Sequence, residues 1–109
     1  MTNVDFQVVF DKLKDEVINL ALSTVKNYKN EAKADALALL DEMKVNLKTW
    51  TLQLAEGNLS QKDYEFLVLG QKELIEMNAL KQAGLSLIKA DEFKNNLLNL
   101  VIDTVAGLI

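Results

Sequence analysis

An apolar stripe of regular spacing constrains the fold of this chain more than any other feature. Its members recur in steps of four, four and three residues: Val17, Ala21, Val25, Tyr28, Ala32, Ala36, Leu39, Met43, Leu47, Trp50 and Leu54. This eleven-residue repeat gives about 3.67 residues per turn, close to the 3.6 of a straight α-helix. Because no Gly or Pro precedes Gly57, nothing in the composition forces a break. We therefore predict one continuous helix over residues 5–56.

The next residues carry the signals of a tight turn and a second helix. Gly57 stands where a helix-ending glycine is expected, and Asn58 is a common turn residue. Ser60 is a good N-cap, with Asp63 three residues later in the first helical turn. A connection of about three residues usually joins antiparallel neighbours. We predict a turn at Gly57, Asn58 and Ser60, and a second arm over residues 60–106.

The apolar phase of the second arm drifts at residues 83–86, around Gly84. Two interpretations stay open from the sequence. The helix can end at Gly84 in a Schellman motif, with Ser86 capping a new helix, or Gly84 can mark a kink inside one long helix.

Two all-α architectures follow for this single domain. The first is a long antiparallel helical hairpin of residues 5–56 and 60–106, which pairs with other copies into a four-helix bundle or a larger helical assembly. The alternative is a compact monomeric four-helix bundle, in which the first arm also breaks near residues 27–30. The unbroken phase from Val25 to Ala36 favours the long hairpin.

Several residue types are missing, and their absence argues against most chemistry. The chain has no His, no Cys and no Arg. The usual ligands of zinc, haem and iron–sulfur clusters are therefore lacking, as are thiol nucleophiles and His-based triads. A net charge of −4 without Arg is unsuited to nucleic acid. We expect no enzymatic activity, no metal or other cofactor, no nucleic-acid partner and no small-molecule substrate.

The two ends of the chain are its most apolar parts, and an antiparallel hairpin would place them side by side. Buried apolar area favours association by about 25 cal/mol per Å², so this end is predicted to pair with a second copy. The predicted interface consists of Phe6, Val9, Phe10, Leu97, Val101, Ile102, Val105 and Leu108.

The function expected from these features is that of a non-enzymatic structural or self-assembling protein, acting through its apolar helix faces and that end. One alternative is a secreted or adaptor hairpin that binds another protein. Another is an amphipathic protein on a lipid surface, which the net negative charge and the lack of a Lys-rich polar face disfavour. The first residues lack a basic segment followed by an apolar core, and no apolar run has membrane-spanning length, which favours a cytoplasmic location.

Overall fold

The computed structural model describes residues 5–109, and every regular element among them is helical. The α-helices are α1 (Phe6–Thr24), α2 (Lys29–Ala55), α3 (Gln61–Leu69), α4 (Asn78–Gln82) and α5 (Leu87–Leu108). Two 3₁₀ turns, η1 (Lys26–Tyr28) and η2 (Gly70–Leu74), stand between them. The predicted all-α class is confirmed.

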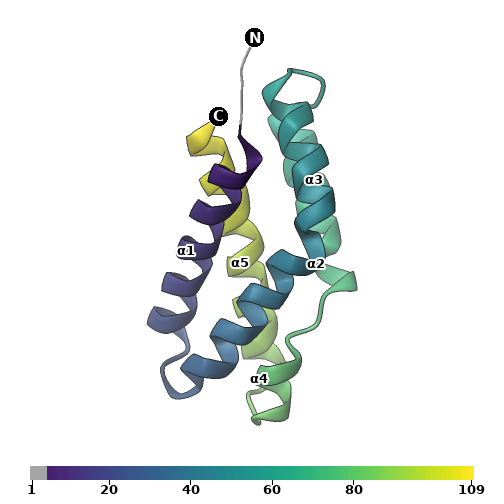
Figure 1. The fold of residues 1–109 in the computed structure, drawn as a ribbon. Coiled ribbons are helices and arrows are strands. Elements are labelled where there is room, and N and C mark those ends of the chain that lie inside the picture. Colours follow the sequence, from purple (N-terminus) through teal and green to yellow (C-terminus); the bar gives the residue numbers. More distant parts are fainter. Residues whose placement is uncertain (1–4) are drawn as a thin grey trace.

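The helices form an up-and-down bundle in which α1, α2 and α5 are the three long members (Figure 1). The fourth position is occupied by α3, η2 and α4 in succession, which run back along the bundle as a broken arm. The start of α1 and the end of α5 lie at the same end of the molecule (Figure 1).

The long hairpin is wrong, and the compact bundle is the architecture observed. The molecule measures 47 × 23 × 19 Å, whereas a helix of fifty residues alone would be about 75 Å long. Both predicted arms are interrupted, the first at residues 25–28 and the second at residues 70–77 and 83–86.

The break in the first arm has a local cause that the apolar stripe conceals. Val25 (φ −114°, ψ 72°), just before η1, and Tyr28 (φ −135°, ψ 40°), its last residue, both leave the helical region. Just before them, the hydroxyls of Ser23 and Thr24 both donate to the Leu20 carbonyl. Such side-chain bonds compete with the helical backbone pattern. This corner, residues 25–28, lets α1 fold back against α2, so both halves of the stripe bury themselves in one core.

The core is continuous between the three long helices and the broken arm. Its fully buried side chains include Leu13 and Val17 of α1, Leu39 of α2 and Val101 of α5. From the broken arm, Tyr64, Val68, Ile75, Met77 and Leu80 join the same cluster. Each helix therefore contributes one apolar stripe, and the bundle closes without a second copy.

Two helices end in Schellman motifs, each with a glycine at positive φ. After α2, Gly57 has φ 81° and the Asn58 amide donates to the Gln53 carbonyl at 2.9 Å. After α4, Gly84 has φ 100° and the Leu85 amide donates to the Leu80 carbonyl at 3.0 Å. Only glycine adopts this conformation without steric cost. Gly84 is therefore the end of a helix and not a kink within one.

Ser60 and Ser86 cap the helices that follow those motifs. The Ser60 hydroxyl accepts from the Asp63 amide at 3.0 Å, and the Ser86 hydroxyl accepts from the Lys89 amide at 3.3 Å.

Replacing Ser60 by Ala is expected to lower the free energy of unfolding by about 1 kcal/mol, because the Asp63 amide loses its acceptor. Ser23→Ala is the matched control, since its hydroxyl only donates to a carbonyl within α1 and caps no amide. Urea denaturation of both variants measures the difference. Equal stability of the two variants would show that the cap contributes nothing.

Candidate functional site

The structure places seven of the eight predicted interface residues inside the chain's own core. Phe6, Val9, Phe10, Leu97, Val101, Ile102 and Val105 are all less than 8 % exposed, and only Leu108 is on the surface, at 46 %. The expectation that these side chains are free to meet a second copy is therefore wrong. The reason is geometric: α1 packs against both α2 and α5, so the apolar ends cover each other within one molecule.

The three predicted turn residues, Gly57, Asn58 and Ser60, lie at the exposed connection between α2 and α3. Their contacts are local: two complete the Schellman motif and the third caps α3. These contacts position the broken arm and leave no side chain arranged for chemistry.

A buried carboxylate that the sequence analysis missed connects α2 to α4. Asp35 is 5 % exposed, and its two oxygens accept from the backbone amides of Ala79 at 2.9 Å and Leu80 at 2.8 Å. The first amides of a helix lack partners within the helix, so Asp35 acts as a cap supplied from another helix. No local sequence signal marks this residue, because its partners lie more than forty positions away.

At the end of η2, the Lys94 side chain binds backbone carbonyls, whereas Asp35 binds backbone amides. The Lys94 ammonium, on a side chain only 13 % exposed, donates to the carbonyls of Lys72 and Ile75, both at 2.8 Å. Asp91 lies 3.3 Å from the Lys72 ammonium and 3.8 Å from that of Lys94. These contacts fix the broken arm to α5, and they leave Lys94 no free hydrogen-bonding role at the surface.

A buried tyrosine, Tyr64, connects α2 and α3. Its hydroxyl lies 3.1 Å from that of Thr51, and both side chains are fully buried between α2 and α3. Burial raises the pKa of the Tyr64 phenol above its ordinary value of 10.0, and the Thr51 hydrogen bond offsets part of that rise. The phenol therefore stays protonated at neutral pH and serves to join the two helices.

The broken arm and the start of α5 carry apolar side chains on the outside of the bundle. We call this set the outer apolar residues; it comprises Phe66 (78 % exposed), Leu69 (42 %), Leu74 (73 %), Leu87 (69 %) and Ile88 (73 %). Two of them, Leu87 and Ile88, border a groove of about 320 Å³ with Met77 and Ala90 among its lining residues. These residues are the most exposed apolar feature between positions 60 and 90.

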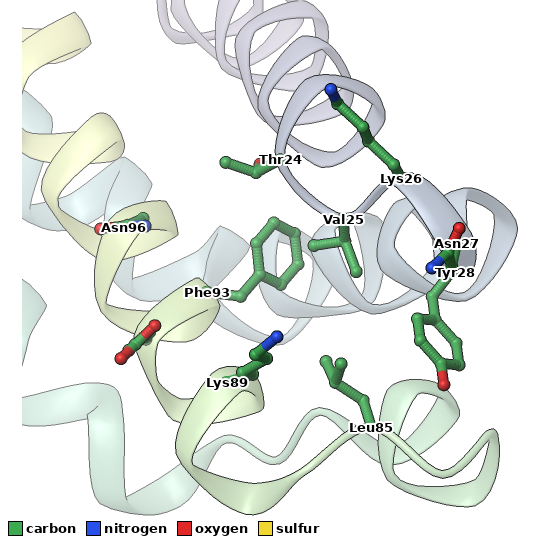
Figure 2. Close-up of a pocket in the computed structure, with 10 residues that line it drawn as sticks. Thr24, Val25, Lys26, Asn27, Tyr28, Leu85, Lys89, Phe93 and Asn96 are labelled. Carbon is green, nitrogen blue, oxygen red and sulfur yellow. The ribbon is translucent and has the colours of Figure 1, made fainter.

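A second hollow, the corner pocket, lies where the chain turns from α1 into α2 and faces α5 (Figure 2). Its volume is about 370 Å³. It is lined by Thr24, Val25, Lys26, Asn27, Tyr28, Leu85, Lys89, Glu92, Phe93 and Asn96.

Within residues 5–109, no three acidic side chains gather into a group that could hold a metal ion. In the same part of the chain, no helix combines the length and apolarity needed to cross a membrane. Comparison with protein-family models, curated proteins and solved structures finds no match to this chain.

Proposed function

We propose that this chain is a non-enzymatic helical protein that acts by self-association through its outer apolar residues. The observation that supports the proposal is the exposure of five large apolar side chains within one stretch of the sequence, residues 66–88. Single exposed apolar residues are ordinary on a protein surface, but several large ones within one short stretch of the sequence favour an interaction surface. The contact residues thus differ from those predicted at the chain ends, which the fold uses internally.

The free energy gained by burying apolar surface favours a contact between two copies through the outer apolar residues. Covering apolar area contributes about 25 cal/mol per Å², and an exposed aromatic ring such as that of Phe66 is the sort of side chain that anchors interfaces. The charged groups that flank the groove are already paired within the chain: Lys72 with Asp91, and Lys81 with Glu76. Their pairing reduces the cost of removing water from this side of the molecule. Two copies related by a two-fold axis would bury the same residues from each side.

The groove beside Leu87 and Ile88 also suits an alternative, an adaptor that binds a different protein. Its lining combines the apolar Met77, Leu87 and Ile88 with the charged Lys81 and Asp91. An apolar side chain from a partner helix could occupy such a groove, in the manner of helix-in-groove recognition.

Sedimentation equilibrium across a wide concentration range tests self-association. The wild type is expected to rise above its monomer mass of 12.2 kDa as concentration increases. A variant with both Phe66→Ser and Ile88→Ser is expected to stay at the monomer mass, because two of the most exposed anchors are lost. Both side chains are on the surface, so helicity should be unchanged in this variant.

Val45→Ser is the matched control, because Val45 is as exposed as Phe66, at 78 %, but lies on α2. This variant should associate like the wild type. A wild type that remains monomeric at every concentration would contradict self-association and leave the adaptor as the better proposal. Association that survives in the double variant would show that other residues form the contact.

A further inference from the structure

The corner pocket is open to solvent and has the size of a small-molecule site. Its volume of about 370 Å³ lies at the lower end of the range found for ligand pockets, roughly 300–1,000 Å³. Three separate segments form it: the corner at residues 25–28, the turn at Leu85 and the first half of α5. The pocket belongs to one folded chain and does not depend on self-association.

The inner part of the pocket is apolar. Phe93 is only 3 % exposed, and Val25 and Leu85 are half-buried beside the core. Figure 2 shows the ring of Phe93 next to Val25, with Leu85 on the opposite side of the space and Tyr28 beyond it. A ligand that enters must therefore have an apolar body.

The polar groups around this apolar part favour a ligand that carries one negative charge. Lys26, Lys89 and Glu92 are the charged residues of the lining, and Asn27 and Asn96 supply amides. In Figure 2 the Lys89 ammonium lies between Phe93 and Leu85, whereas Lys26 extends away from the pocket. Among the described residues, Lys89 forms no ion pair. One ammonium suits an anion of a single charge, and the nearby Glu92 carboxylate repels anions of higher charge such as a phosphate dianion, so a carboxylate is the anion favoured.

We propose that the corner pocket binds a small monocarboxylate with an aromatic or aliphatic body. The body packs on Phe93, Val25 and Leu85, and the carboxylate pairs with the Lys89 ammonium between Phe93 and Leu85. Apolar contact supplies most of the affinity, since an ion pair at an exposed lysine is weak in water. The carboxylate mainly sets which ligands are preferred.

Amide chemical-shift titrations with phenylbutyrate and with its neutral amide, phenylbutyramide, test this site. Both probes are expected to give saturable shifts at the amides of Val25, Leu85 and Phe93. The carboxylate should bind about threefold more tightly than the amide, the size of effect expected for an exposed ion pair.

Lys89→Gln should bring the affinity for phenylbutyrate down to that for phenylbutyramide. Lys48→Gln, which removes an exposed lysine from the far half of α2, should leave both affinities unchanged. Asn96→Trp places a large side chain at an exposed position in the lining and should abolish binding of both probes.

The absence of saturable shifts with either probe would overturn the proposal, as would shifts that persist in Asn96→Trp. Equal affinity for the two probes in the wild type would overturn the assignment of a carboxylate. Because none of these readouts depends on molecular mass, failure here is distinguishable from failure of self-association.

Discussion

Replacing Val101 by Asp is expected to unfold the chain. Val101 is fully buried on α5, within the cluster that joins all the helices. An ionised carboxylate there would lack water and a designed partner, at a cost of several kcal/mol. A domain of this size is stable by only about 5–15 kcal/mol, so most or all of the folded population should be lost. Far-UV circular dichroism and a urea titration measure the loss.

Val45→Asp is the matched control, since it makes the same change at a valine that is 78 % exposed. Its free energy of unfolding should change by no more than about 0.5 kcal/mol, as for other surface substitutions. If Val101→Asp kept its helicity and lost only a larger assembly, Val101 would belong to an interface between copies, and the buried position seen in the bundle would be contradicted.

Removing the Asp35 carboxylate should lower the free energy of unfolding by the second-largest amount, after the Val101→Asp substitution. Asp35→Ala leaves the amides of Ala79 and Leu80 without acceptors in a buried location. Hydrogen bonds to a charged group contribute about 1.5–3 kcal/mol each, so we expect the free energy of unfolding to fall by about 3 kcal/mol. Hydrogen exchange should also become faster at Ala79 and Leu80, because α4 is held to α2 by these bonds.

Asp41→Ala provides the control, because Asp41 lies on the same helix and is exposed. Its free energy of unfolding should differ little from that of the wild type. Asp35→Asn keeps one acceptor oxygen, so its free energy of unfolding should lie between those of Asp35→Ala and Asp41→Ala. Equal stability of Asp35→Ala and Asp41→Ala would show that α4 is held by apolar packing alone.

Local signals in the sequence located the turn after α2 and the serine caps, whose partners lie within a few residues. The Schellman turn at Gly57 and the cap at Ser60 each depend on contacts no more than five positions apart. Gly84 and Ser86 repeat that arrangement, and the structure decides between the two interpretations that the sequence left open there.

The candidate sites depended on the path of the whole chain and were not predictable in the same way. The expected interface assumed an antiparallel hairpin whose apolar end stays uncovered, but the chain folds back at the corner and α1, α2 and α5 cover that end together. An apolar stripe keeps its phase across a bend whenever both halves face one core, so periodicity cannot distinguish a straight helix from a folded one. The corner pocket exists only because the chain turns at residues 25–28 and α5 passes beside it.

Composition and periodicity were thus sufficient for the all-α class, for the apolar stripe between Val17 and Leu54 and for the caps at Ser60 and Ser86, because propensity, amphipathic spacing and capping act over a few residues. Tertiary structure decided how α1 folds back against α2, the cap that Asp35 supplies to α4, and which apolar side chains remain outside. Those features depend on which segments meet in space, since burial of a stripe is a property of its neighbours and not of its own spacing. Phe10 became core and Phe66 became surface for this reason, although both are phenylalanines on amphipathic helices.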